Sequence, residues 1–350
     1  MRNRTVDVAK GIAGVFVVLG HTLAFRYQDG ALLLLTHLTT PLYLFLSGVF
    51  IKVDRPWRQA LWRLFDALLK PYFVVLLLWG AWHAFYGDFD WFYYLAGVLY
   101  GTGSTIVLVP LWFLPHIFLC CVVARVFLKD LRYAENLTAC VLLIVVGLTV
   151  GLYAIDWMWR QPLPAGDGWR YWFAATTHWP GLPFSADVLP VSVACLLAGY
   201  VLSERVQRCR FRALLWLIAA LIAVAVIYSG AFFDINRRIA VKPLGVALLL
   251  AAGLYVVILG AAGLARWKLA ADFFSYLGRY FLLVLLLHLL VLRWVYHGFE
   301  AWLPNSGDWQ IAVMFVVGMA SSLVLIEVVR RSRVLSMLLL PLTGSGKSSP

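Results

Sequence analysis

Ten stretches of mostly apolar residues follow one another along the 350-residue chain, each long enough to cross a bilayer as a helix. A spanning helix needs about 20 such residues, and in lipid only helices and closed barrels satisfy all backbone hydrogen bonds. We therefore predict an all-α integral membrane protein, a bundle of about ten transmembrane helices. The predicted spans are 7–26, 32–51, 68–86, 111–128, 137–155, 187–203, 212–231, 243–264, 273–297 and 309–329.

Composition supports a membrane protein, because 63% of the residues are hydrophobic and only 13% are charged. Soluble domains are nearer half apolar and a quarter charged. The 16 Trp and 16 Tyr suit the two membrane–water interfaces. We expect one transmembrane domain over 1–335 and a polar cytoplasmic tail over 336–350.

The basic residues predict the orientation in the membrane. With ten spans, 22 of the 29 Lys and Arg residues fall on the side of the N-terminus. Basic loops favour the cytoplasm, so we expect both termini there. This topology accounts for the net charge of +12 and argues against a nucleic-acid partner. The loop with Arg237, Arg238 and Lys242 is the exception to the rule.

Two outer loops are longer than a turn requires. Residues 87–110 contain an apolar stretch broken by GTGS, which favours a re-entrant or interfacial element over an eleventh span. Residues 156–186 are rich in Trp, Pro and Gly, which fits either a sugar-binding loop or a plain membrane interface. None of the five Cys lies in an outer loop, and no Cys/His spacing indicates a metal site.

The first span, DVAKGIAGVFVVLGHTLAF (7–25), carries a polar stripe. Lys10 and His21 are eleven residues apart, hence about 20° apart around a helix and about 16 Å along it. Asp7 and Gly14 lie close to the same line. Polar groups on one stripe face a bundle interior or a wet cavity, because facing lipid costs several kcal/mol. Alternatively, Asp7 and Lys10 pair and snorkel at the boundary, and His21 is a hydrogen-bonded core histidine.

A second histidine, His288, lies inside the ninth span, fifteen residues after Phe273 and thus about 22 Å along the helix. Two histidines at similar depth could share one pocket. Alternatively, His288 has only a structural role, as a hydrogen-bonding side chain.

Several blocks of the chain resemble membrane-bound acyltransferase family 3, which includes O-acetyltransferases of bacterial polysaccharides. These blocks, in order, are TVDVAKGIAGVFVVLGH (5–21), PLYLFLSGVFIK (41–52), RLFDALLKPY (63–72), LWFLPHIF (111–118), LPFSADVLPVSVACLLAGYVL (182–202) and FSYLGRYFLLVLLLH (274–288). The resemblance covers about residues 5 to 330. It implies transfer of an acyl group, usually acetyl from acetyl-CoA, to a glycan hydroxyl in a bacterial inner membrane.

The resemblance also implies roles for individual residues. His21 would be the general base or a covalent acyl carrier, with Lys10 and Asp7 at the donor end. Coenzyme A phosphates would meet the basic segment 52–70, with Lys52, Arg63 and Lys70, although positive-inside topology alone explains its charge. Arg63 and Lys70 are seven apart, hence on one helical face. The candidates for binding the glycan or lipid-linked acceptor are His288, His37, Trp112, Ser185 and Asp187. No permanently bound cofactor and no metal is expected, and membrane lipids surround the protein.

Two positions depart from the family pattern. The basic residue of the first-helix signature is often Arg and is Lys10 here, which replaces a bidentate fork by a point charge. Many sugar acetylases of the family carry a His two residues before the second-helix Pro, where this chain has Thr39; His37 lies two residues away. Two other classes remain open, a transporter of a glycan precursor or solute and a scaffold of a polysaccharide assembly complex.

Overall fold

The protein is described here by a computed structural model, which covers residues 3–25, 38–87, 89–160, 181–302 and 308–342. Eight helices in these ranges are long and apolar enough to cross a membrane. They correspond to eight of the predicted spans, and the chain is therefore an all-α, multi-pass integral membrane protein. These helices are α1 (Arg4–Ala24), α4 with η1 and α5 (Trp57–Tyr86), η2 with α7 and η3 (Val109–Asp130), α8 (Leu137–Arg160), η5 with α10 (Pro183–Val201), α13 (Pro243–Leu264), α15 (Phe281–Trp302) and α16 (Trp309–Arg331).

Two further helices match the remaining predicted spans. Helix α12 (Ala213–Tyr228) is apolar but shorter than the eight. Helix α3 (Thr39–Gly48) is the described part of the predicted span 32–51, whose first six residues lie outside the described ranges. Helices thus occur at all ten predicted positions, and in the described residues eight of them are long enough to cross a membrane.

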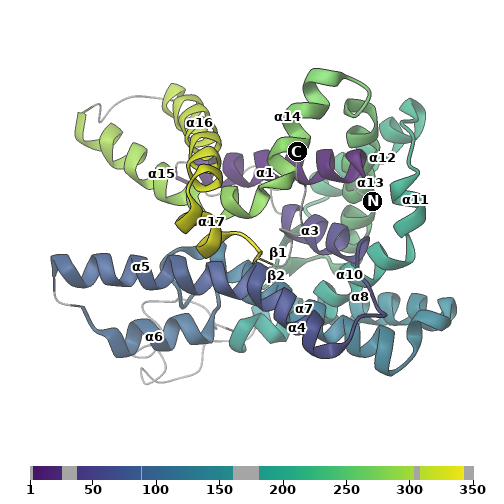
Figure 1. Ribbon diagram of the computed structural model, residues 1–350. Helices are drawn as coiled ribbons and strands as arrows, with labels where there is room; N and C mark the ends of the chain where they lie inside the picture. The colour runs from purple at the N-terminus through teal and green to yellow at the C-terminus, as the bar shows by residue number, and fades with distance from the viewer. Residues whose placement is uncertain (1–2, 26–37, 88, 161–180, 303–307, 343–350) are drawn as a thin grey trace, which may run out of the picture.

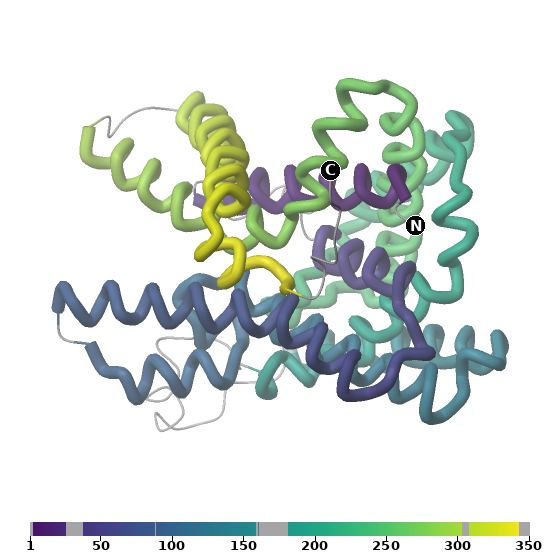
Figure 2. The backbone as a smooth tube through the Cα atoms, in the orientation of Figure 1, coloured from purple at the N-terminus to yellow at the C-terminus, as the bar shows by residue number. Residues whose placement is uncertain are grey.

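Three of the spanning helices consist of segments with different helical geometry. The first is made of α4 (Trp57–Leu64), η1 (Phe65–Leu69) and α5 (Lys70–Tyr86), and the second of η2 (Val109–Trp112), α7 (Phe113–Arg125) and η3 (Val126–Asp130). The third is made of η5 (Pro183–Val188) and α10 (Leu189–Val201). Both η1 and η3 are π-helical turns, whereas η2 and η5 are 3₁₀ turns. Figure 2 shows α4, η1 and α5 running on as one continuous rod. The other short elements are η4 (Tyr133–Glu135), α6 (Trp91–Tyr100), α11 (Ser203–Gln207), α14 (Lys268–Arg279), α17 (Arg333–Leu339) and an antiparallel pair of strands, β1 (Phe232–Asp234) and β2 (Ile239–Val241).

The outer loop 87–110 contains the short helix α6, which is too short to span a bilayer. Asp90 caps its first turn by accepting from the backbone N–H groups of Phe92 and Tyr93. The Tyr94 hydroxyl donates to the Leu76 carbonyl of α5 at 2.6 Å. Helix α6 consequently lies alongside α5 (Figure 2).

Helix α1 occupies the centre of the molecule and packs against α3, α13, α14, α15 and α16 (Figure 1). Its closest neighbour is α14, which crosses it. A Cβ on Gly11 would lie 1.9 Å from the Phe274 carbonyl oxygen, and a Cβ on Gly278 would lie 1.9 Å from the Asp7 carbonyl oxygen. Glycine at both positions therefore allows the two backbones to touch.

The ninth predicted span, 273–297, begins at the wrong residue. Helix α14 ends at Arg279, and α15 begins at Phe281 after a change of direction at Tyr280. The apolar sequence runs on across this point, so hydropathy alone does not reveal it. The turn follows directly after Gly278, which lies against the α1 backbone. His288 is accordingly only seven residues into its helix, about 10 Å along the axis, not the predicted 22 Å.

The fold extends beyond residue 335, where we placed the end of the membrane domain. Helix α17 packs against α16 and α5, and Leu339 is buried. The carbonyl of Leu340 accepts a hydrogen bond from Lys70 at 2.7 Å. Residues 336–342 are therefore part of the folded unit, and the remaining tail lies outside the described residues.

Candidate active site

The polar stripe of α1 begins at a capped N-terminus. The Asn3 side chain accepts from the Val6 N–H at 3.1 Å, which satisfies one of the free donors of the first turn. Asp7 follows in that turn, where a carboxylate is favoured by the helix dipole. Asp7, Lys10 and His21 are all half-buried. Because α1 is surrounded by five helices, these groups do not lie on an open lipid face.

The aliphatic and aromatic surroundings of Lys10 come from α3 and the residues after it. The Lys10 ammonium lies 5.5 Å from the centre of the Phe50 ring, in a cation–π arrangement. Its backbone carbonyl accepts a hydrogen bond from the Tyr43 hydroxyl. Lys10 is thus held near the end of α3, inside the helix bundle.

The middle of the stripe is filled by an aromatic pair. The rings of Tyr43 and Phe281 stack with their centroids 3.5 Å apart. A Cβ on Gly14 would lie 3.4 Å from the Phe281 ring, an ordinary contact. Gly14 consequently faces an aromatic side chain, and the close approach to another backbone occurs one turn earlier, at Gly11.

His21 lies in the last turn of α1 and meets His288 of α15. The centroids of the two imidazole rings are 5.1 Å apart and the ring planes are tilted by 46°. His288 is completely buried. The sequence placed these two histidines on helices whose contact was unknown; the structure brings their rings together.

The hydrogen bonds of His288 identify its tautomer. Its Nδ1 lies 2.7 Å from the Val284 carbonyl oxygen, which can only accept, so Nδ1 carries the proton. Its Nε2 is buried and has no hydrogen-bond partner among the described residues. In the neutral ring this nitrogen has a free lone pair. His288 therefore presents an unused proton acceptor in the region of His21.

A small cavity of about 70 Å³ lies at the C-terminal end of α1, lined by Thr22 and Phe25 but by neither histidine of the pair. It is large enough for a few water molecules. The rings of Phe25 and Tyr296 stack at its edge with centroids 4.9 Å apart. Thr22, which follows His21, and the carboxylate-bearing Glu300 also line it. A polar, partly aromatic space thus adjoins the end of the stripe.

The three basic residues predicted for coenzyme A are distributed over two places. Lys52 is exposed beyond α3, and its carbonyl accepts from Arg125 at 2.8 Å. Arg63 is half-buried in the last turn of α4. The π-helical turn η1 lies between Arg63 and Lys70, so their seven-residue spacing no longer corresponds to two α-helical turns. The predicted common face of Arg63 and Lys70 does not follow from the spacing.

Lys70 already has two close partners. Its ammonium donates to the Asp66 carboxylate at 2.7 Å and to the Leu340 carbonyl at 2.7 Å. The second Asp66 oxygen accepts from the Leu342 N–H at 2.7 Å. Asp66 is buried and Lys70 is mostly buried. This pair joins the middle of the α4–α5 helix to the last described residues.

Three acceptor-binding candidates, Trp112, Ser185 and Asp187, lie in a separate buried cluster. Arg238 is its centre: its Nε donates to Asp187 at 2.8 Å and an Nη donates to the Ser185 hydroxyl at 3.1 Å. The Arg238 and Asp187 side chains are only 5% and 7% exposed. Arg238 comes from the turn between β1 and β2 and is one of the three loop charges that contradicted the positive-inside tally. It is buried in an ion pair, which explains its own position in that loop.

His116 of α7 belongs to the same cluster and was missed by the sequence analysis. Its Nδ1 donates to the Phe184 carbonyl at 3.0 Å, and its Nε2 lies 2.7 Å from the Ser192 hydroxyl. The Trp112 ring stands 5.3 Å from the His116 ring. Phe184 and Ser185 both adopt left-handed backbone conformations, with φ of 56° and 55°. The sequence signal that could have indicated this cluster is Arg238, a basic residue in a loop predicted to lie on the outer side of the membrane.

His37, the remaining acceptor candidate, lies outside the described residues. Within the described ranges, no group of three or more His, Cys, Asp or Glu side chains could hold a metal ion. The half-buried polar stripe of α1 and the buried imidazole nitrogen without a partner among the described residues meet at His21 and His288.

Comparison with known proteins identifies the family of this site. A family model described as an acyltransferase domain, that of acyltransferase family 3, matches residues 3–329. No curated protein and no solved structure matches the chain. The match spans α1 with Lys10 and His21, and it continues through α15 and His288 into α16. The chain belongs to acyltransferase family 3 and is an acyltransferase.

Proposed function

We propose that this acyltransferase transfers an acetyl group from acetyl-CoA to a sugar hydroxyl, in a surface polysaccharide or exopolysaccharide or its lipid-linked precursor. Its location would be a bacterial inner membrane. The family generally acylates sugars, which favours this reaction over the transporter and the scaffold. The observation that carries the proposal is the His21–His288 pair, with rings 5.1 Å apart and a free Nε2 on His288.

The chemistry assigned to the pair follows from what a sugar hydroxyl lacks. A hydroxyl is a weak nucleophile and requires a base as its oxygen attacks the thioester carbonyl. In our proposal the His21 imidazole takes this proton, the C–S bond breaks, and coenzyme A leaves as a thiolate that recovers the proton. The Nε2 of His288 can accept an N–H of His21 and so orient the other His21 nitrogen towards the hydroxyl.

The same residues suit a second route, in which His21 first accepts the acyl group as a covalent carrier. Pre-steady-state kinetics separate the two routes. The carrier route releases a burst of coenzyme A in the absence of acceptor, whereas direct transfer does not.

The donor end of the site would lie towards Lys10. Lys10 and Asp7 are half-buried on the stripe, and Lys10 can attract the thioester carbonyl or a phosphate. Lys52 and Arg63 are the basic residues we assign to the coenzyme A phosphates. Lys70 is engaged with Asp66 and Leu340, so we assign it chiefly to holding the chain end.

The acceptor end would lie towards the C-terminal end of α1, where Thr22 and Phe25 line the small cavity. The stacked rings of Phe25 and Tyr296 offer an aromatic surface, and Glu300 offers hydrogen-bond acceptors. Sugars use both kinds of contact. Asp187 and Ser185 are engaged by Arg238 in the separate buried cluster, and we assign them to supporting the fold there.

The test is acetyl transfer by purified protein in nanodiscs, with labelled acetyl-CoA and an acceptor glycan. His21→Ala is expected to lower kcat by about 10²- to 10⁴-fold, the usual contribution of a general base. His83→Ala, which changes an exposed histidine on α5, is the matched control. Undiminished transfer by a correctly folded His21→Ala protein would remove His21 from the mechanism.

A further inference from the structure

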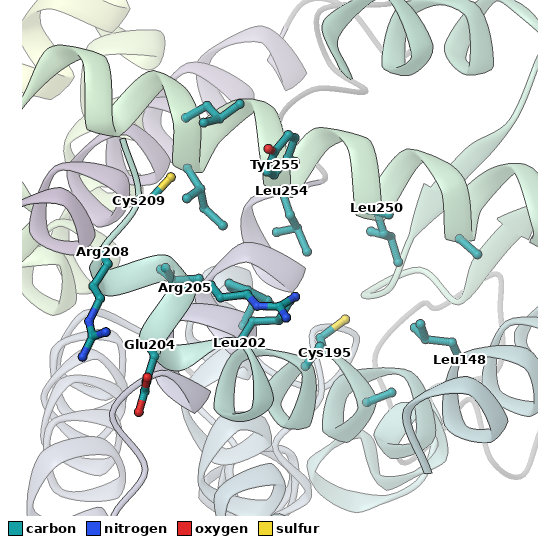
Figure 3. Close-up of a pocket in the computed structure, with 18 of the residues that line it drawn as sticks. Leu148, Cys195, Leu202, Glu204, Arg205, Arg208, Cys209, Leu250, Leu254 and Tyr255 are labelled. Atoms are coloured by element: carbon teal, nitrogen blue, oxygen red, sulfur yellow. The ribbon is translucent and has the colours of Figure 1, made fainter. Parts of the chain in front are cut away.

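A cavity of about 760 Å³ lies between α8, α10, α11 and α13 (Figure 3). This volume is in the range of ligand-binding sites. None of its lining residues belongs to α1 or α15, so it is separate from the histidine pair. The site assigned above leaves it without a role.

The interior of the cavity is apolar. Cys195 of α10 faces Leu250 and Leu254 of α13 across it (Figure 3). Ala198 of α10 and Ile258 of α13 also line it. The short side chains on α10 leave space that the longer α13 side chains do not fill. A void of this size between two spanning helices costs dispersion contacts unless an apolar ligand occupies it.

One end of the cavity is strongly basic. Four arginines from the segment 203–212 line it, namely Arg205, Arg208, Arg210 and Arg212. The Arg205 side chain extends between α10 and α13, whereas the Arg208 guanidinium extends away from them (Figure 3). No hydrogen bond or ion pair joins Arg205 to another residue in the described part of the chain. An unpaired guanidinium at the mouth of an apolar cavity favours an anionic partner.

The cavity is also accessible from the side that spanning helices present to lipid. Ala251 and Tyr255 of α13 line it and are both exposed. By the distribution of basic residues, the segment 203–212 lies at the cytoplasmic face. Basic pockets between transmembrane helices on that side bind the head groups of anionic lipids.

We propose that this cavity binds an anionic phospholipid, with its phosphate at Arg205 and an acyl chain between α10 and α13. Charge complementarity selects the head group, and the apolar walls select a chain over a soluble phosphate compound. The bound lipid fills the gap between α10 and α13 and couples α11 to both helices. The proposal is independent of the acetyl-transfer chemistry.

The experiment measures phospholipid retained by the full-length protein after detergent purification from membranes containing phosphatidylglycerol and phosphatidylethanolamine. Mass spectrometry gives the amount of each class per chain. Wild type is expected to retain phosphatidylglycerol in near-stoichiometric amount. Arg205→Gln is expected to retain about tenfold less, because it loses a charged hydrogen bond. Arg266→Gln, which changes an exposed arginine that follows α13 and does not line the cavity, is the matched control and is expected to retain the wild-type amount.

A second variant tests the apolar part of the site. Ala251→Phe places a ring in the cavity from an exposed position, so it should expel the lipid while the protein still elutes as a folded species in size exclusion. Equal phosphatidylglycerol in wild type, Arg205→Gln and Ala251→Phe would overturn the proposal. So would retention of neutral lipid instead, or displacement of the lipid by free coenzyme A, which would make the cavity a donor site.

Discussion

The imidazole rings of His21 and His288 lie 5.1 Å apart, one in the last turn of α1 and the other in the second turn of α15. This contact depends on the crossing of α14 over α1, which delivers the start of α15 to the middle of α1. The Nε2 of His288 has no partner among the described residues, so the pair retains one unused lone pair inside the bundle.

His288→Asn tests whether that nitrogen positions His21. Asparagine can keep the hydrogen bond to the Val284 carbonyl but has no equivalent of Nε2. We expect kcat to fall by about 100-fold or more and its pH profile to move, with the folded fraction unchanged. The measurement is the pH dependence of acetyl transfer. His297→Asn, at an exposed position of the same helix, should leave both quantities as in wild type. An unaltered pH profile for His288→Asn would show that His288 has only a structural role.

Gly11→Ala tests the crossing itself. The added Cβ would lie 1.9 Å from the Phe274 carbonyl oxygen, so α14 has to move away from α1. We expect a loss of stability of about 1–3 kcal/mol or more, the usual cost of overpacking. Thermal unfolding in detergent measures it.

Gly14→Ala is the control for this substitution, because its Cβ would make only an ordinary contact at 3.4 Å with the Phe281 ring. It should be neutral or slightly stabilising, since Ala favours helix over Gly by about 1 kcal/mol. Equal unfolding midpoints for the two variants would contradict the observed crossing.

Asp187→Asn tests the buried ion pair with Arg238. The substitution leaves a guanidinium that is 5% exposed without its counter-charge. Removing one partner of a buried pair costs about 3–5 kcal/mol, whereas replacing both by apolar residues costs much less. The double variant Asp187→Leu with Arg238→Met should therefore unfold at a higher temperature than Asp187→Asn alone.

The exposed pair Arg4–Asp272 is the reference for that experiment. Its side chains are 50% and 61% exposed, and Asp272→Asn should cost no more than about 1 kcal/mol. If Asp187→Asn lowers the stability of the protein no more than Asp272→Asn does, the Arg238 cluster does not hold the fold together.

Cys209 offers a test of orientation. It is half-exposed between α11 and α12, whereas the other four cysteines are buried. A membrane-impermeant maleimide should label it from the cytoplasmic side alone, and Cys209→Ser should abolish the labelling.

Burial raises the pKa of the Cys209 thiol, and Arg212 partly opposes this. Because the thiolate is the reactive form, the labelling rate should rise with pH, and Arg212→Gln should slow it at neutral pH. Labelling of intact cells by the impermeant reagent would reverse the predicted topology.

The sequence predicted the helices well and the site in part, for different physical reasons. Apolar runs must form helices in lipid, so eight of the ten predicted spans appear among the described residues as helices of spanning length. The polar stripe on α1 was visible because its spacing matches the helical period. By contrast, the contact between His21 and His288 depends on two glycines that let backbones cross, and no periodicity encodes such a crossing.

The partners of buried charges were also beyond sequence reasoning. Lys70 was interpreted as a phosphate ligand from its place in a basic segment, but its partners are Asp66 one turn before it and a carbonyl near the other end of the chain. Arg238 was one of three basic residues in the loop that violated the topology rule, and its ion pair with Asp187 accounts for that residue. A basic residue that violates the positive-inside rule can indicate a buried cation, but the sequence alone does not identify the carboxylate with which it pairs.

The contact of Lys70 and Asp66 with Leu340 and Leu342 has a consequence for biosynthesis. The α4–α5 helix enters the membrane early in translation, yet the groups that complete its buried ion pair emerge from the ribosome 270 and 276 residues later. Until then Lys70 has one protein acceptor fewer, and Asp66 one donor fewer, than in the mature fold. A ribosome that stops before residue 340 consequently leaves an incompletely satisfied charge in the third transmembrane segment, a mark by which quality-control proteases can distinguish a truncated chain from a finished one.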